Sequence, residues 1–258
     1  MPKPDTLLKD TLAGHELSEE EALSLLKTKG SSVFKIAKAA DDLCTEKCGN
    51  TVTYVRNQNI NVTNHCINSC GFCGFCKKDG EEGTYFYTED IIREKAKEAH
   101  RIGIMTTATI MYGHVESQKD VVSHLKILKD IQSETGGFTE FVPLSFVHYN
   151  TPLYKSGVAR AGATGREDLL MYAVSRLYLH NFDNIQVSRV KHGTKFAQLA
   201  LIAGANDIGG TMFEESISKG AGAVNTDYLD PKEMERIVSD AEKTLVQRNT
   251  KYEIIQNS

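Results

Sequence analysis

The sequence predicts an α/β protein in which parallel strands alternate with helices after a helical extension. Strand-like and helix-like stretches alternate from residue 51 onward, whereas the first fifty residues show only helical spacing of their apolar side chains. Such alternation builds a parallel sheet, which either closes into a barrel or opens into a doubly wound sheet. In both arrangements ligands gather at the carboxyl ends of the strands.

Ser18 and Glu21 predict a capping box at the start of a helix. Residues 1–50 are expected to form helices and to be an N-terminal extension, and residues 51–258 are expected to form the core. Strands are expected near residues 59–65, 105–112, 139–145, 184–190 and 206–212. Helices are expected near 88–103, 118–134, 166–180 and 193–203, and a last one at 230–247 begins with Pro231. The core therefore contains about five strand–helix units.

Composition narrows the classes of function. The 258 residues are 40% hydrophobic, enough for a proper core, and the formal net charge of -4 comes from interspersed acids and bases. This balance offers no basic surface for nucleic acid and no polybasic membrane patch. No run of eighteen apolar residues occurs and the opening does not resemble a signal peptide, so we expect a cytoplasmic protein that acts on small molecules.

Four of the six cysteines stand together in "NHCINSCGFCGFC". Cys66, Cys70 and Cys73 follow the expected first strand with the spacing Cys-x-x-x-Cys-x-x-Cys. A tight loop with this spacing would direct three thiolates at one iron–sulfur cube and leave the fourth iron open to a ligand. In a reducing compartment, clustered thiols more often bind metal or carry out redox chemistry than form disulfides.

A structural zinc site is the rival interpretation of these cysteines. Cys73 and Cys76 form a Cys-x-x-Cys pair, and Cys44 with Cys48 would complete four thiolates. The Cys44 pair lies at helical i, i+4 spacing, where a buried cysteine is commonly a core residue. Cys76 is either a further ligand or a bystander, and a fourth protein ligand would close the open iron.

Longer segments resemble a known family. The three-cysteine spacing is that of radical S-adenosylmethionine (SAM) enzymes. The segments "NINVTNHCINSCGFCGF", "GGFTEFVPLSFVHYNTPLY", "NFDNIQVSRVKHG" and "GANDIGGTMFEESISKGAGA" resemble the radical SAM enzymes of deazaflavin and menaquinone biosynthesis. The resemblance runs from about residue 17 to the C-terminus. Within the family, "GGFTEFVPL" and "GANDIGGT" favour the branch of the second FO synthase subunit over the futalosine enzymes of the menaquinone route.

The resemblance implies a radical SAM (β/α) barrel. It also implies a [4Fe-4S] cluster on Cys66, Cys70 and Cys73, with SAM at the open iron and Phe72 beside the adenine. The implied activity is a transferase that joins the 4-hydroxybenzyl group of L-tyrosine to 5-amino-6-(D-ribitylamino)uracil, towards coenzyme F(420). An electron donor and the first FO synthase subunit are the implied partners. The alternatives are a menaquinone-pathway enzyme and a non-catalytic iron–sulfur or metal-binding remnant.

Polar residues at the expected strand ends are the candidates for contact with cofactor and substrate. We expect catalytic roles for Glu116, His148 and Asp207, and cofactor contacts for Tyr112, His114, Asn206 and Thr211. Each also has a structural interpretation, since a histidine such as His148 is commonly a hydrogen-bonded structural residue. Glu214 and Glu215, just beyond, could simply cap the helix that follows.

The chain departs from the resembled family in length. A closed barrel has eight strand–helix units, and here five are expected. The stretch "YTEDIIREKAKEAHRIGIMTTATI" joins what resembles the start of the first barrel helix to the end of the fourth, which places an internal deletion near residues 92–100. Three explanations are open: a deleted product that no longer catalyses, a sheet completed by a partner or second copy, or a small natural variant.

Overall fold

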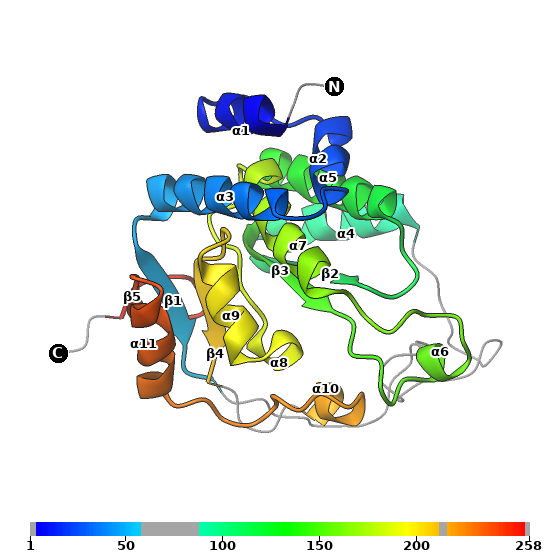
Figure 1. Ribbon diagram of the computed structural model, residues 1–258, viewed down its shortest axis with the longest axis vertical. Helices are drawn as coiled ribbons and strands as arrows, with labels where there is room; N and C mark the ends of the chain where they lie inside the picture. The colour runs from blue at the N-terminus through cyan, green and yellow to red at the C-terminus, as the bar shows by residue number, and fades with distance from the viewer. Residues whose placement is uncertain (1–3, 58–87, 212–215, 256–258) are drawn as a thin grey trace.

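The computed structural model describes residues 4–57, 88–211 and 216–255 (Figure 1). The helices are α1 (Pro4–Leu12), α2 (Glu19–Leu26), α3 (Ser32–Cys48), α4 (Glu89–Arg101), α5 (Gln118–Thr135), α6 (Pro152–Lys155), α7 (Gly165–Tyr178), α8 (Arg189–His192), α9 (Thr194–Leu201), α10 (Ser216–Gly220) and α11 (Pro231–Asp240). The strands are β1 (Thr51–Val55), β2 (Thr106–Tyr112), β3 (Phe138–Ser145), β4 (Asp207–Gly210) and β5 (Thr244–Arg248).

All strand pairs are parallel, as the alternation of elements predicts. β1 pairs with β4 on one side and β5 on the other, and β2 pairs with β3. Isolated bridges at Ile185 and Gln186 connect β3 to β4. The extended segments therefore follow one another as β2, β3, 185–186, β4, β1 and β5. Within the described residues no pairing closes β5 onto β2, so a parallel α/β sheet is observed and a closed barrel is not.

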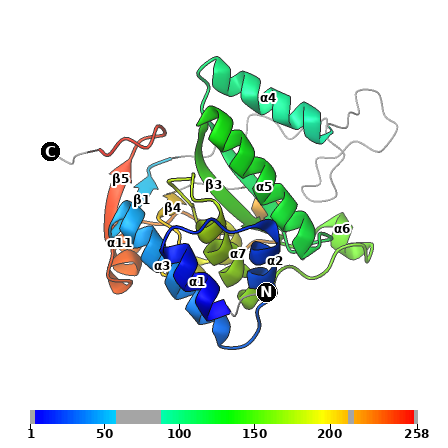
Figure 2. The same cartoon turned by 90° about the horizontal axis from the view of Figure 1, so that it is seen from above.

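The N-terminal helices join the same core as the sheet. Ser18 and Glu21 form the predicted capping box of α2, and α3 packs along α7. Ile36 and Ala40 of α3 are completely buried, and α7 is buried around its whole circumference from Leu170 to Tyr178. Figures 1 and 2 show α1, α2 and α3 gathered with α5 and α7 on the side where β1 begins, away from α6 and α10. This arrangement leaves the carboxyl ends of the strands facing α6 and α10.

The predicted helices at 88–103, 118–134 and 166–180 and the strands at 105–112 and 139–145 are confirmed to within a few residues. Gly103 ends the α4 segment with a positive φ of 86°, as expected of a glycine after a helix. Among the described residues, no helix is both long enough and apolar enough to cross a membrane.

Two boundaries were wrong. The predicted strand at 184–190 contributes only the bridges at Ile185 and Gln186, because the chain turns into α8 at Arg189. The last helix ends at Asp240 rather than at 247. After a turn in which Glu242 has a φ of 57°, residues Thr244–Arg248 pair with β1 as β5. The β-branched and apolar run at 244–246 finds a strand partner there, which a helical reading of the sequence overlooked.

Candidate functional site

The cysteine loop lies outside the described residues, together with Phe72, the expected strand at 59–65, Glu214 and Glu215. The strand that reaches this loop is β1, which ends at Val55, upstream of the expected position. In the described part of the chain, no group of three or more His, Cys, Asp or Glu side chains could hold a metal ion.

Cys44 and Cys48 lie one turn apart on α3, at the end of the molecule where β1 begins. The Cys44 Sγ is buried 3.9 Å from the Ala205 carbonyl, and the Cys48 thiol donates to the Asp183 carbonyl at 3.5 Å. The neighbouring Cys48 side chain, together with the nearby Arg176 guanidinium, lowers the pKa of Cys44 to about 6. These thiols thus have protein partners of their own, and the zinc interpretation gains no further ligand from the described residues.

A cavity of ≈ 420 Å³ lies beyond the carboxyl end of β3. We call it the carboxyl-end cavity. Its walls come from the end of β3, the loop at 161–163, the first turn of α7, α8 and the segment 222–225. The polar and aromatic groups on these walls include Ser145, His148, Tyr149, Asp168, His192 and Asn225. Its volume is within the usual range for small-molecule sites.

Two side chains on one wall of the carboxyl-end cavity, Asp168 and His192, contact the buried hydroxyl of Tyr112 behind them. The Tyr112 hydroxyl donates to Asp168 Oδ1 at 2.7 Å and lies 3.0 Å from His192 Nε2. His192 Nε2 is also 3.5 Å from Asp168 Oδ1, and its Nδ1 is 3.1 Å from the Ser188 carbonyl. Burial and the Asp168 charge raise the pKa of Tyr112 well above its usual value, so its hydroxyl stays protonated. We call these three residues the cavity cluster.

His148 lies on the opposite part of the cavity wall. Its ring lies tilted against Tyr149 at 4.2 Å and meets Tyr154 edge-on at 4.6 Å, measured between ring centroids. Gly162, with a φ of 82°, lies beside this ring, and a Cβ added there would be in ordinary van der Waals contact with His148 Nδ1 at 3.6 Å. Within the described residues no hydrogen bond engages the imidazole, so packing alone holds the ring in place and leaves its nitrogens available.

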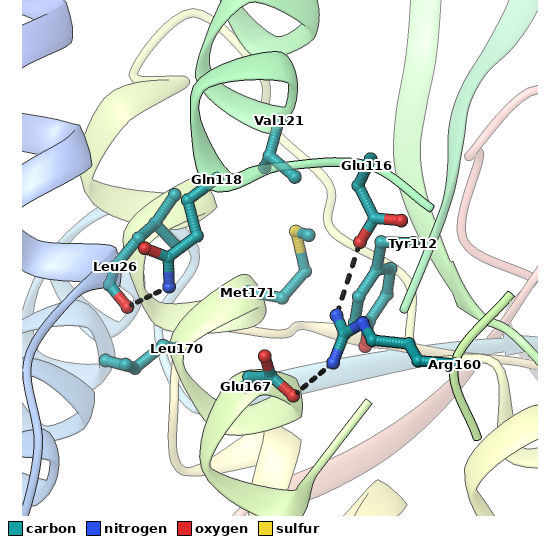
Figure 3. A pocket seen from close by; sticks show the side chains of 9 residues that line it. All are labelled: Leu26, Tyr112, Glu116, Gln118, Val121, Arg160, Glu167, Leu170 and Met171. Atoms are coloured by element: carbon teal, nitrogen blue, oxygen red, sulfur yellow. Dashed lines mark hydrogen bonds and ion pairs between the residues drawn. The ribbon is translucent and has the colours of Figure 1, made fainter. Parts of the chain in front are cut away.

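A second cavity, of ≈ 300 Å³, lies on the other side of Tyr112, between α2, α5 and α7. Figure 3 shows Arg160 between Glu116 and Glu167 at its mouth, with N–O distances of 3.4 and 2.9 Å. Burial alone would raise the pKa of Glu116. Hydrogen bonds from the His114 ring and from the backbone amides of Gly113 and His114 outweigh burial and lower it to about 2. Glu116 is therefore an anion that fixes the loop after β2.

Thr211 lies beyond the carboxyl end of β4. Its hydroxyl donates to the Asn57 carbonyl at 3.1 Å, so it ties the end of β4 to the end of β1. Arg189 donates to the carbonyls of Thr211, Asn225 and Asp227 at 2.8–3.1 Å. Its buried Nε has no partner in the described part of the chain. Arg189 therefore holds the segment that forms the far wall of the carboxyl-end cavity.

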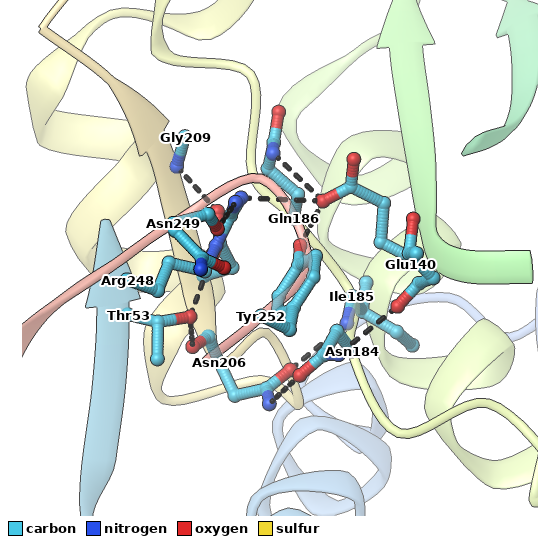
Figure 4. A network of polar contacts seen from close by, with 12 residues as sticks. Thr53, Glu140, Asn184, Ile185, Gln186, Asn206, Gly209, Arg248, Asn249 and Tyr252 are labelled. Carbon is cyan, nitrogen blue, oxygen red and sulfur yellow. Dashed lines mark hydrogen bonds and ion pairs between the residues drawn. The ribbon is translucent and has the colours of Figure 1, made fainter. Parts of the chain in front are cut away.

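A network of polar contacts around Arg248 and Glu140 lies in the interior of the sheet (Figure 4), and it includes Asp207. Its Oδ2 accepts from Thr53 at 2.6 Å and from Arg248 Nε at 2.5 Å, and its Oδ1 accepts from the Gly209 amide at 2.7 Å. Arg248 also approaches Glu140 at 3.4 Å. Glu140 also accepts hydrogen bonds from the side chains of Thr107, Gln186 and Tyr252. We call this set the interior cluster.

Asn206 and Asp207 were predicted as site residues at a strand end. They stand at the amino end of β4. The Asn206 Oδ1 accepts from Arg176 at 2.7 Å and from the Ile185 amide at 2.8 Å, and its Nδ2 donates to Asp183 and Asn184. Both side chains are consumed by contacts within the protein.

The remaining sequence candidates divide between the two cavities. His148 lines the carboxyl-end cavity, while Glu116 lines the smaller cavity and pairs with His114. Tyr112 joins the two, since its ring lines the smaller cavity and its hydroxyl reaches Asp168 and His192. Asp168 and His192 were missed by the sequence reasoning. His192 stands inside the quoted segment "NFDNIQVSRVKHG", but Asp168 follows an ordinary capping box and carries no local signal.

Comparison with known sequences identifies relatives over most of the chain. The family model of the CofH/MqnC C-terminal region matches residues 135–258. The chain is 44% identical to a protein of Methanosphaerula palustris named 5-amino-6-(D-ribitylamino)uracil--L-tyrosine 4-hydroxyphenyl transferase, with 96% of this chain and 97% of the relative covered. A protein of the same name from Methanoculleus marisnigri is also 44% identical, with 99% of both chains covered.

The relatives have segments that this chain lacks. The alignment with the Methanosphaerula protein extends over 354 positions, whereas this chain has 258 residues, so at least 96 of those positions have no residue here. Because both chains are covered almost from end to end, these gaps lie inside the aligned region.

Solved structures show the fold class. HydG, a maturase of the [FeFe]-hydrogenase, matches with a TM-score of 0.63 at 13% identity over 96% of this chain and 76% of its own. HydG from Carboxydothermus hydrogenoformans matches with a TM-score of 0.66 at 11% identity over 96% of this chain and 80% of its own. At these identities the likeness concerns the fold alone.

Proposed function

Because the chain belongs to the family of 5-amino-6-(D-ribitylamino)uracil--L-tyrosine 4-hydroxyphenyl transferases, we propose that it acts on L-tyrosine and 5-amino-6-(D-ribitylamino)uracil and joins the 4-hydroxybenzyl group of the first to the second. The observation that carries this proposal is the 44% identity along 96% of the chain. The shared name of the relatives favours this branch over the futalosine enzymes.

We place the tyrosine in the carboxyl-end cavity. The cavity lies where parallel α/β folds bind their ligands, and its ≈ 420 Å³ exceeds what one aromatic amino acid needs. His148 and Tyr149 offer aromatic surfaces for a phenol ring, and Asp168 and Asn225 offer polar contacts. In this proposal His148 contacts the substrate, and Arg189 keeps the facing segment in position through its three carbonyl contacts.

We propose that Cys66, Cys70 and Cys73 hold a [4Fe-4S] cluster and that its open iron binds SAM. The donor set fits, since cysteine thiolates are the usual ligands of such clusters and three of them leave one position open. When bound, the cluster and SAM would supply the one-electron chemistry that starts the reaction on tyrosine. Thr211 remains a proposed cofactor contact because it lies where β4 and β1 end, beside Asn57.

Five other sequence candidates change their place in the proposal. Tyr112 becomes a positioning residue through its bond to Asp168, and His114 with Glu116 shapes the loop after β2. Asn206 and Asp207 are assigned to the framework. The first FO synthase subunit and an electron donor remain predicted partners.

We propose that the segment present in the relatives and absent here lies near residues 92–100, within α4 and upstream of β2. Among the described residues, β2 pairs only with β3, and the Thr109 carbonyl accepts from His124 at 2.9 Å instead of from a further strand. Ile102, Ile104 and Met105 just before β2 are each more than half exposed. An unpaired edge beside exposed apolar side chains is the expected result of removing neighbouring strands.

The test is product formation by the full chain, reconstituted anaerobically and supplied with SAM, a reductant, tyrosine and the aminouracil. We expect 5'-deoxyadenosine and the coupled product, both detected by mass spectrometry. The Cys70→Ala variant should make neither, and the Cys76→Ala variant should retain both. Cleavage of SAM without coupled product would overturn the substrate assignment. Absence of both products from the wild-type chain would favour the non-catalytic interpretation.

A further inference from the structure

In the cavity cluster of Tyr112, Asp168 and His192, the described part of the chain contacts only one of the two carboxylate oxygens of Asp168. Asp168 Oδ1 accepts from Tyr112 at 2.7 Å and lies 3.5 Å from His192 Nε2. For Asp168 Oδ2, none of the described residues provides a hydrogen-bond donor. The Asp168 side chain is 14% exposed and lines the carboxyl-end cavity, so its second oxygen is accessible from there.

The hydrogen bonds fix the protonation of the cluster. His192 Nδ1 faces the Ser188 carbonyl, which only accepts, so Nδ1 carries a proton. The short contact of Tyr112 with Asp168 uses the phenolic proton. The Tyr112 oxygen in turn lies 3.0 Å from His192 Nε2, so Tyr112 stands between the imidazole and the carboxylate. The charge of Asp168 is therefore held in place from the protein side.

Other charged groups do not occupy the free side of Asp168. Lys191 also lines the cavity, but its Nζ donates to Ser218 Oγ. Arg160 turns to Glu116 and Glu167 in the smaller cavity. A carboxylate that is partly withdrawn from water and bonded on one oxygen gains most from a charged donor on the other.

We infer that Asp168 binds the protonated amine of the ligand in the carboxyl-end cavity, with Tyr112 and His192 as the residues that position its carboxylate. This inference rests on the proposed function, because it assigns the amino end of the tyrosine substrate. It makes the cavity selective for aromatic ligands that carry a cationic amine, and it orients the phenol ring away from Asp168 towards the aromatic wall at His148 and Tyr149.

The experiment measures equilibrium binding to the full chain, prepared anaerobically, by titration calorimetry with three ligands. L-tyrosine carries amine and carboxylate, tyramine carries only the amine, and 3-(4-hydroxyphenyl)propanoate carries only the carboxylate. We expect both amines to bind more tightly than the propanoate. The Asp168→Asn variant should weaken both amines by ~10- to 100-fold and leave the propanoate unchanged, since one charged hydrogen bond is lost.

The matched control is Glu167→Gln. Glu167 is the neighbouring acid on α7, faces the smaller cavity, and can keep its capping bond as a glutamine. It should bind all three ligands as the wild type does. A second variant, Tyr112→Phe, keeps the carboxylate and should weaken the amines only a few-fold, which separates positioning from direct contact.

The outcomes separate the inference from the proposed function. Unchanged amine binding by Asp168→Asn, or equal weakening of all three ligands, overturns the role of Asp168 and leaves the proposed substrate in place. Equal affinity of the wild type for tyrosine and the propanoate overturns it as well. Failure of the wild type to bind any of the three overturns the tyrosine assignment itself, and the inference falls with it.

Discussion

The interior cluster and the cavity cluster are both buried groups of charged and polar side chains, yet they differ in how completely their acceptors are used. In the interior cluster, both oxygens of Asp207 and both of Glu140 accept hydrogen bonds from the protein. In the cavity cluster, one oxygen of Asp168 lacks a donor among the described residues. A saturated network fixes the fold, whereas an unsaturated one beside a cavity is equipped to bind.

The largest effect is expected from breaking the saturated cluster. Arg248 is 4% exposed at its side chain and is the cation that both Asp207 and Glu140 contact. Replacing it by methionine would leave two buried carboxylates without their charge partner, which costs about 3–5 kcal/mol of unfolding free energy. Urea unfolding followed by circular dichroism measures this loss. Because protonation would remove the uncompensated charges, the loss should shrink as the pH is lowered towards 4.

The control for Arg248 is an arginine in an exposed pair. Arg236→Met breaks a contact with Glu233 on the surface of α11, where the Arg236 side chain is 70% exposed, and should leave the stability essentially unchanged. Similar losses for the two variants would show that the interior cluster does not carry the stability assigned to it.

A smaller effect is expected in the cavity cluster. Tyr112→Phe removes the donor to Asp168 and the contact with His192, and should cost about 2 kcal/mol, since hydrogen bonds to charged groups are among the stronger ones. Water entering from the cavity can replace the lost contact, so the cost should stay below that of Arg248→Met. A thermal or urea unfolding curve equal to that of the wild type would contradict the described bonding.

The comparison also shows which parts of the molecule its sequence could predict. Helical spacing and capping residues act within a few positions, so the start of α2 and the bounds of α5 and α7 were predicted nearly correctly. Tyr112 and His148 were predicted as site candidates because they stand at the carboxyl ends of clearly alternating strands. Local spacing is enough for such features.

Features that depend on distant partners were not predictable in the same way. β5 is a strand because β1 pairs with it, although residues 244–248 lie almost two hundred positions away and continue a helical pattern. Asp168 becomes functional only because β2 and α8 bring Tyr112 and His192 to it. Asp207 was predicted as a site residue from its position in the sequence, whereas in the structure Arg248 and Thr53 donate hydrogen bonds to its carboxylate.

The pKa values of Glu116 and Glu140 are shifted in opposite directions. Glu116 has a folded-state pKa of about 2, below its usual 4.5, so the unfolded chain binds more protons between these values. Its contribution to stability is complete above pH 4.5 and is lost as the pH falls towards 2. Burial raises the pKa of Glu140, so there the folded state holds the proton more tightly, and its ionisation lowers stability as the pH rises above 4.5.

The two contributions can be separated by the slope of stability against pH. Glu116→Gln should flatten the decrease between pH 4.5 and 3, an effect of about 1–2 kcal/mol after partial screening by solvent, and should leave the slope above pH 4.5 unchanged. Glu140→Gln should flatten the slope above pH 4.5 instead. Urea unfolding at half-unit pH steps measures both. If Glu116→Gln changed the slope above pH 4.5, or Glu140→Gln changed it below pH 4.5, the loop after β2 and the interior cluster would be energetically coupled. The molecule would then not divide into a binding region and a framework region.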